Sequence, residues 1–252
     1  MTIYEAISAA RRAIDEAVRA AGRTDHVALE LAAKTRTPAE CHEAAACLAR
    51  LGGPVLVGHN RVQEARTTAE AVRRVDGARI HLIGPLQSNK INQALACVDA
   101  VETVSSAELA RRIDARATRP LPVFVQVNVS GEATKSGCAP DAVAPVIDAV
   151  SECANLRLAG FMTVGLNSTD EAPVRRAYAR LRSIRDDAAA RTGIGAASLE
   201  LSMGMSRDMA WAIAEGATIV RLGTAVFGAR PPASPHPPEP DGTRTRTGWN
   251  AH

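Results

Sequence analysis

The sequence predicts an α/β fold, a (β/α)8 TIM barrel with an additional N-terminal helix. Apolar strand-like runs alternate with helical stretches along the chain, and the alternation can be counted eight times. Several runs, such as residues 123–127 with the single polar Gln126, are apolar almost throughout, as parallel strands are when both faces of the sheet are buried. The alternation, the count and the apolar strands together indicate a closed parallel barrel surrounded by helices.

The additional helix is expected at residues 2–21. Apolar side chains recur there at the spacing of one helical face, for example at Ile3, Ile7, Ile14 and Val18, and Gly22 follows as a stop signal. Because this segment precedes the first strand, it lies outside the repeating strand–helix pattern.

The repeating elements follow in order. The strand candidates are short apolar runs, at 27–33, 55–57, 79–83, 100–103, 123–129, 157–164, 198–202 and 218–222. The helix candidates have apolar residues at helical spacing, at 39–51, 62–75, 88–96, 107–117, 141–153, 172–192 and 206–215, with a final helical turn at 224–228. A doubly wound open sheet uses the same alternation and stays an alternative. No GxGxxG motif follows the first strand, which weakens the dinucleotide-binding form of that alternative.

Composition and charge narrow the functional classes. The chain has 252 residues, of which 46% are hydrophobic and 23% charged, as is typical of a globular protein. Its 30 basic and 27 acidic residues give a net charge of +3, and the arginines are scattered, so no nucleic-acid partner is expected. No apolar run approaches the ~20 residues that cross a bilayer, and residues 1–23 lack the apolar core of a signal peptide. We therefore expect a cytoplasmic protein with no membrane partner.

One domain followed by a tail is predicted. Residues 1–230 are expected to form a single barrel domain, without a second domain or internal repeat. The composition changes at Pro231, since six of the 14 prolines fall in residues 231–240 and a polar segment follows. Residues 231–252 are therefore expected to be a Pro-rich disordered tail.

The cysteines do not indicate a metal site. Five are present, at positions 41, 47, 97, 138 and 153, and they form no CxxC pair. The histidines do not lie at metal-ligand spacing from them either. We expect free, buried thiols and no bound metal.

One lysine stands where a barrel places its chemistry. Only three of the 30 basic residues are lysines, Lys34, Lys90 and Lys135. Lysine can lose its proton and act as an amine, which arginine does not do in proteins. Lys34 ends the first strand, at the face where such barrels carry their active sites. Partial desolvation there favours a neutral amine that condenses with an aldehyde, and a solvated surface lysine is the alternative.

The last two loops have the composition of a phosphate site. Residues 201–206 follow the seventh strand and residues 221–224 follow the eighth, where barrels often bind phosphate through small residues and helix amides. Gly223 allows close approach of a ligand, and Ser202 and Thr224 offer hydroxyl donors. Tight turns that bind nothing also contain small residues, so the pattern alone leaves both interpretations open.

An amine on one side of the barrel mouth and a phosphate site on the other indicate a ligand with both an aldehyde and a phosphate. Pyridoxal phosphate is the common cytosolic molecule of that description. Arg221 would then lie near the pyridine nitrogen, and because arginine only donates, that nitrogen would be unprotonated. An unprotonated ring favours holding the cofactor over carbanion chemistry. The alternative for Arg221 is a structural ion pair; Asn60, after the second strand, either caps the next helix or lies against the ring of a ligand.

Taken together, five ordered motifs resemble one family. They are Ala33–Arg36, Gly58–Glu64, His81–Lys90, Leu201–Ser206 and Val220–Thr224. In this order they are similar to the pyridoxal phosphate homeostasis proteins, single-domain relatives of the alanine racemase N-terminal barrel. The resemblance extends from the first helix to about Arg230 and leaves out the tail.

The resemblance implies a pyridoxal phosphate site built by seven residues: the Schiff-base amine of Lys34, the phosphate contacts of Ser202, Gly223 and Thr224, the pyridine contact of Arg221, and the ring contacts of Asn60 and Met203. One position departs from the family, which usually has glutamate where this chain has His59. That replacement is expected to alter contacts at the rim but not the Schiff base.

The resemblance implies a cofactor carrier or buffer in vitamin B6 and amino-acid homeostasis rather than an enzyme. A pyridoxal-phosphate-dependent amino-acid racemase or lyase is the alternative, and a barrel without cofactor is a third. In racemases of this type a tyrosine from a second domain is the second acid/base, whereas Tyr4 and Tyr178 fall on predicted outer helices here. The expected partners are the cofactor and apo-enzymes that need it, and the expected state is a monomer, with a dimer as the alternative.

Overall fold

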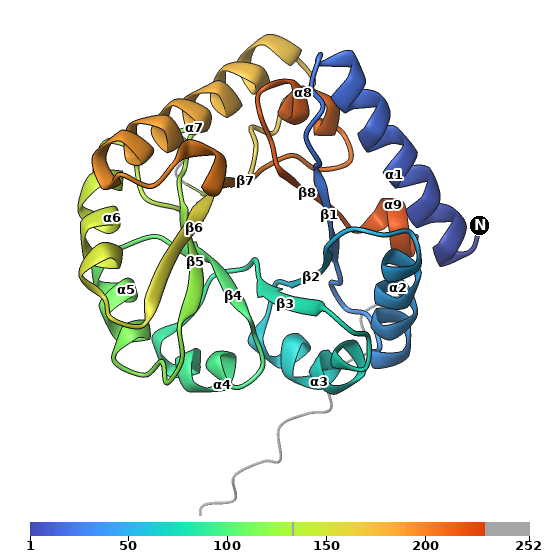
Figure 1. The fold of residues 1–252 in the computed structure, drawn as a ribbon, viewed down its shortest axis with the longest axis horizontal. Coiled ribbons are helices and arrows are strands. Elements are labelled where there is room, and N and C mark those ends of the chain that lie inside the picture. The colour runs from blue at the N-terminus through green and yellow to red at the C-terminus, as the bar shows by residue number, and fades with distance from the viewer. Residues whose placement is uncertain (133, 230–252) are drawn as a thin grey trace, which may run out of the picture.

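Eight parallel strands form a closed barrel in the computed structural model, which describes residues 1–132 and 134–229. Each strand pairs with the next, and β1 pairs with β8 to close the ring (Figure 1). The predicted (β/α)8 barrel is therefore confirmed, and the open sheet is excluded because its two edge strands would be unpaired. The tail expected at residues 231–252 lies outside the described residues.

The strands are short, between three and seven residues long. They are β1 (Ala28–Ala32), β2 (Val55–His59), β3 (Ala78–Leu82), β4 (Ala100–Val104), β5 (Leu121–Gln126), β6 (Leu156–Met162), β7 (Glu200–Ser202) and β8 (Ile219–Leu222). Every strand overlaps the run that predicted it.

Helices surround the barrel on its outer side (Figure 1). They are α1 (Ile3–Ala20), α2 (Pro38–Arg50), α3 (Val62–Arg73), α4 (Ile91–Leu95), α5 (Ala107–Asp114), α6 (Val143–Glu152), α7 (Glu171–Thr192), α8 (Met209–Ala214) and α9 (Thr224–Phe227). Short 3₁₀ turns occur at Ser88–Lys90, Pro140–Ala142 and Ala196–Ser198. None of the described helices is both long and apolar enough to cross a bilayer.

Local sequence determines where the first helices begin. Thr2 and Glu5 form a capping box, in which each side chain bonds the other residue's backbone amide. Thr37 and Glu40 repeat the arrangement at α2, where Pro38 occupies the first helical turn. The second capping box makes α2 begin directly after the loop that carries Lys34.

Two predicted helices begin three residues later than the sequence predicts. The helix expected from Ser88 begins with a 3₁₀ turn and continues as the short α4. The helix expected from Ser206 begins only at Met209. Gly204 has a φ of +94°, and the carboxylate of Asp208 accepts a hydrogen bond from the Met205 amide at 2.7 Å. This turn keeps residues 204–208 out of α8 and available to the barrel mouth.

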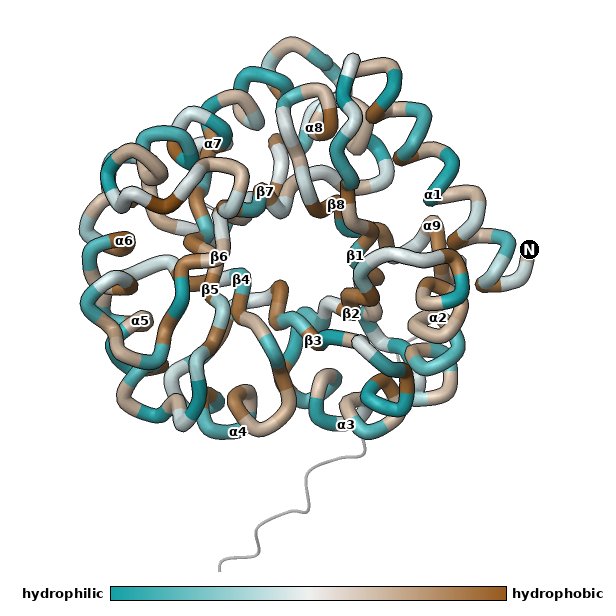
Figure 2. The backbone as a smooth tube through the Cα atoms, viewed as in Figure 1, coloured by the Kyte–Doolittle hydropathy of each residue, from teal (hydrophilic) through white to brown (hydrophobic). Residues whose placement is uncertain are grey.

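The main hydrophobic core lies between the strands and the surrounding helices. A smaller cluster fills one part of the barrel interior, with Ala28, Leu56, Phe124, Met162 and Ile219. Strands β3, β4 and β7 also carry hydrophilic positions among the hydrophobic ones (Figure 2). The polar side chains of His81, Glu102 and Ser202 on these strands are buried, so part of the barrel interior is polar, whereas branched apolar side chains usually fill this space.

Candidate cofactor site

A cavity of about 320 Å³ opens at the carboxyl ends of the strands. Its wall comes from the ends of β1, β2 and β8 and from the loops that follow β3, β6 and β7: Ala32, Lys34, Arg36, Asn60, Ile83, Val164, Met205, Ser206, Arg221, Gly223 and Thr224. Five of the seven residues predicted for the site, Lys34, Asn60, Arg221, Gly223 and Thr224, thus lie around one cavity.

Lys34 projects from a tight turn after β1. The Lys34 amide donates to the Ala32 carbonyl at 3.0 Å, and the Thr35 hydroxyl donates to the Lys34 carbonyl at 2.7 Å. Thr35 has a φ of +57°, which is strained for a β-branched residue and is typical of functional sites. Within residues 1–132 and 134–229, no ion pair or hydrogen bond occupies the half-buried Lys34 amine. It is therefore free to meet a ligand.

Hydroxyls, backbone amides and a cation line the same cavity, from the loops after β1, β7 and β8. Gly223 and Thr224 begin α9, whose first amides have no partner within the helix. The Ser206 hydroxyl lies on the same cavity wall, as does Arg36. The Arg36 guanidinium stacks 5.3 Å from the ring centroid of Phe227 and donates to the Gly228 carbonyl at 3.0 Å. These donors are suited to an anionic group.

The sequence predicts Ser202 and Met203 on the cavity wall, and the structure places both elsewhere. Ser202 is fully buried inside the barrel, where its hydroxyl donates to Glu102 Oε2 at 2.5 Å. Met203 is fully buried in the main core. The turn at Gly204 instead brings Met205 and Ser206 to the cavity. The motif does reach the cavity, but the turn geometry decides which of its residues face a ligand.

Arg221 forms part of the cavity floor and is 5% exposed. One terminal nitrogen donates to the Ser202 hydroxyl at 2.7 Å, and the other donates to the Thr163 carbonyl at 2.6 Å. These bonds fix the guanidinium plane from two sides. Its direct partners are a neutral hydroxyl and a carbonyl, so the simple ion pair that the sequence allows is not what holds it.

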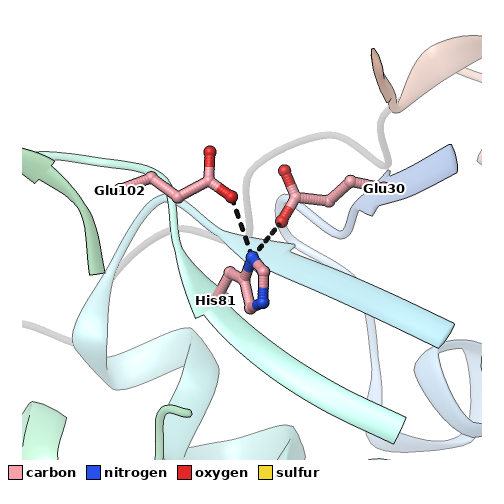
Figure 3. A group of neighbouring side chains, drawn as sticks. All are labelled: Glu30, His81 and Glu102. Atoms are coloured by element: carbon pink, nitrogen blue, oxygen red, sulfur yellow. Dashed lines mark hydrogen bonds and ion pairs between the residues drawn. The ribbon is translucent and has the colours of Figure 1, made fainter. Parts of the chain in front are cut away.

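Two acidic residues and a histidine meet inside the barrel below this floor (Figure 3). His81 Nδ1 lies 2.8 Å from Glu102 Oε1 and 3.1 Å from Glu30 Oε1. The sequence contains a signal for this cluster that reasoning from motifs misses, because each glutamate interrupts an apolar strand: Glu30 lies in 28–32 and Glu102 in 100–104. A charged residue inside a buried strand is uncommon unless it is paired.

Burial and pairing shift the ionisation of this cluster. Burial lowers the pKa of His81, but its contacts with Glu102 and Glu30 outweigh burial and raise the pKa to about 10. Burial and the charge of Glu102 raise the pKa of Glu30 to about 7. Burial alone would raise the pKa of Glu102, yet the hydrogen bond and charge of His81, together with Arg221, hold it below its usual value.

A pH dependence of stability follows from His81. Its pKa in the folded state is about 10, above the ordinary value of 6.5, so the folded protein binds the proton more tightly than the unfolded chain. We expect this stabilisation to be complete below pH 6.5 and to be lost as the pH rises toward 10. Urea unfolding from pH 6 to 9 (roughly this window) should show the decline, and His81→Gln should flatten it. An equal decline in the variant would contradict this assignment.

His59, the position that departs from the resembled family, does not lie on the cavity wall. Its side chain is fully buried, and its Nε2 lies 2.9 Å from the Thr68 hydroxyl on α3. Burial lowers its pKa to about 4, so the ring is neutral at physiological pH. Asn60, the next residue, lies on the cavity wall. The His59 side chain therefore lies between β2 and α3, away from the predicted ligand contacts.

Comparison with known proteins identifies the family of this chain. The family described as alanine racemase, N-terminal domain, matches residues 8–231. The pyridoxal phosphate homeostasis protein of Pseudomonas aeruginosa is 39% identical over 238 residues, which cover 93% of this chain and 98% of that protein.

Solved structures are similar over most of the chain. An unknown protein from Bifidobacterium adolescentis is 38% identical with a TM-score of 0.81, covering 89% of this chain and 94% of that one. PipY of Synechococcus elongatus PCC7942, solved with PLP bound, is 29% identical with a TM-score of 0.74, covering 90% of this chain and all of its own. The chain therefore belongs to the pyridoxal phosphate homeostasis proteins, within the family of the alanine racemase N-terminal domain.

Proposed function

We propose that this protein binds pyridoxal 5'-phosphate in the cavity at the barrel mouth and carries or buffers it in vitamin B6 and amino-acid homeostasis. One observation carries the proposal: a single cavity joins the Lys34 amine, which has no partner among the described residues, to several hydrogen-bond donors suited to an anion. An aldehyde that also bears a phosphate matches both ends. The names of the relatives and the PLP-bound PipY structure support the same ligand.

Each end of the ligand has its own residues in this proposal. Lys34 forms the Schiff base with the aldehyde, and Arg221 donates to the pyridine nitrogen. Gly223 and Thr224 hold the phosphate together with Ser206, to which we assign the hydroxyl role first expected of Ser202. The Schiff base supplies reversible covalent capture, which suits storage and release of a reactive aldehyde.

Removal of the phosphate should weaken binding. Charge-assisted hydrogen bonds contribute ~1.5–3 kcal/mol each, so pyridoxal is expected to bind at least about 100-fold more weakly than pyridoxal phosphate. Ser206→Ala should narrow that difference, because it removes one donor from the phosphate end. Absorbance titrations with both vitamers measure the two affinities. Equal affinities for the two vitamers in the wild-type protein would contradict the assignment of the phosphate end.

We favour a carrier over a racemase or lyase because the described cavity wall offers no tyrosine. Tyr4 is 40% exposed on α1. Tyr178 is fully buried, and its hydroxyl donates to Asp208 at 2.8 Å. Racemisation needs a proton donor on each face of the cofactor, and neither tyrosine reaches this cavity. The names of the relatives describe homeostasis and not catalysis.

Amino-acid turnover tests the carrier against the enzyme. Protein loaded with pyridoxal phosphate is incubated with single L-amino acids, and chiral chromatography follows the products over time. A carrier should give less than one product per protein molecule. Accumulation of D-amino acid or of cleavage product over many turnovers would favour the racemase or lyase.

We further infer that apo-enzymes that need pyridoxal phosphate receive it from this protein, which would act in the cytoplasm. Free cysteines support a reducing compartment: all five are unpaired, and burial raises the pKa of Cys41 to about 12 and that of Cys138 to about 11. A monomer remains the expected state.

A further inference from the structure

Four charged side chains lie in the middle of the barrel interior. Glu30, His81, Glu102 and Arg221 come from β1, β3, β4 and β8, and each is 6% exposed or less. An isolated buried charge is costly, so buried charges are retained where they are paired. Only Arg221 among the four lies on the wall of the cofactor cavity.

A chain of hydrogen bonds leads from this interior to the cavity floor. His81 contacts Glu102 Oε1 at 2.8 Å (Figure 3), and Glu102 Oε2 accepts from the Ser202 hydroxyl at 2.5 Å. The same hydroxyl accepts from Arg221 Nη1 at 2.7 Å. A hydroxyl has a single proton. Because Ser202 gives that proton to Glu102, its lone pairs are turned toward Arg221.

The charges in this layer balance without a metal ion. Glu30 and Glu102 both contact His81, and Glu102 reaches Arg221 through the Ser202 hydroxyl, so that two negative charges meet two positive ones when both carboxyl groups are ionised. Although the Glu30, His81 and Glu102 donor atoms are close enough together to bind a metal, a divalent cation would add positive charge beside the Arg221 guanidinium. Protons and hydrogen bonds therefore account for the cluster better than a metal does.

We propose that Glu102 is a positioning residue for the cofactor: through Ser202 it orients the Arg221 guanidinium at the cavity floor, and Glu30 and His81 complete the charge balance around it. The inference rests on the proposed function, because it concerns how Arg221 meets the pyridine ring. Glu102 itself touches no ligand. These buried contacts hold the Arg221 guanidinium at the cavity floor in one orientation, so that it can donate a hydrogen bond in a fixed direction.

Substitution of Glu102 tests this role. Glu102→Gln keeps the size of the side chain but removes its charge, and its amide no longer requires the Ser202 proton. We expect pyridoxal phosphate to bind about tenfold more weakly, the loss of roughly one charge-assisted hydrogen bond. We also expect a shifted pH midpoint for the visible band of the Schiff base. Ser202→Ala breaks the same chain without touching the charges and should shift both readouts in the same direction.

Two controls separate positioning from a general loss of stability. Glu215 is a buried carboxylate, 8% exposed, whose ion pairs at 2.8 Å go to Arg175 and Arg182, away from the cavity. Glu215→Gln should lower Tm but leave the affinity and the pH midpoint unchanged. In an Arg221→Met background, Glu102→Gln should change the affinity less than about twofold, because coupled residues are not additive.

The outcomes are distinguishable. Wild-type protein that takes up no pyridoxal phosphate would overturn both this inference and the proposed function. If the wild-type protein binds pyridoxal phosphate and Glu102→Gln changes neither the affinity nor the pH midpoint, this inference alone is overturned. It is also overturned if Glu102→Gln weakens binding as much in the Arg221→Met background as in the wild type. If Glu102→Gln does not fold, a Ser202→Ala variant with unchanged affinity and pH midpoint overturns the inference in its place. If the wild-type protein contains one equivalent of metal and a variant substituted at Glu30 does not, the cluster is a metal site and this inference is overturned.

Discussion

Lys34→Ala is expected to abolish the visible absorption of bound pyridoxal phosphate at stoichiometric cofactor and to weaken binding by at least about 100-fold, or ~3 kcal/mol. The amine of Lys34 is the group on the cavity wall that can condense with an aldehyde. Without it the phosphate and pyridine contacts remain, so residual binding should be non-covalent. A spectroscopic titration of the wild-type protein and the variant measures both effects.

Lys34→Arg is the matched control for charge. It keeps a cation at the end of β1, but its guanidinium does not form the imine. If covalent capture is what matters, this variant should be as impaired as Lys34→Ala. Binding restored to near the wild-type level by arginine would instead mean that Lys34 acts only as a positive charge.

Gly84→Ala is expected to unfold at a clearly lower urea concentration than the wild-type protein. A Cβ at Gly84 would lie 2.1 Å from the Asn60 carbonyl oxygen and 2.8 Å from its Cα. Both atoms are backbone, so relief requires the ends of β2 and β3 to separate. Overpacking of this kind costs ~1–3 kcal/mol or more. Urea unfolding should show the loss as a lower midpoint at unchanged slope.

Gly195→Ala provides the comparison for Gly84. Gly195 has a φ of −56°, which alanine adopts readily, and a Cβ there would have Ser198 Oγ as its nearest neighbour, at 3.9 Å. The stability of this variant should remain within ~1 kcal/mol of the wild type. Since Gly84 packs against Asn60, the Gly84 variant should also lose cofactor affinity. Two variants of equal stability would show that the close approach at Gly84 is not restrictive.

The sequence was sufficient for the barrel because its signals are local. A run such as 55–57 is apolar on both faces, and capping residues such as Thr37 fix where a helix begins. The location of Lys34 and Thr224 at the barrel mouth could be predicted for a similar reason: a barrel brings the carboxyl ends of its strands to one face, so a residue that follows a strand lies at the mouth.

The sequence was not sufficient where backbone geometry or distant pairing decides the outcome. Ser202 and Ser206 are both serines of one motif, and only the turn at Gly204 determines that the second faces the cavity. Glu102 and Ser202 are 100 residues apart, so their hydrogen bond follows from the closure of the barrel and from no local pattern. Glu30 in an apolar strand indicates a polar group inside the barrel, but the sequence does not show which residues it contacts.

Borohydride reduction of the protein with bound pyridoxal phosphate, followed by peptide mass mapping, identifies the amine that captures the cofactor. The chain has three lysines, Lys34, Lys90 and Lys135, so only these three side-chain amines can carry the reduced cofactor. Lys135 is paired with Glu132 at 2.7 Å. We expect the reduced adduct on the peptide that contains Lys34. A fully unmodified Lys34 peptide, with the label on Lys90 or Lys135 or with no label at all, would contradict it.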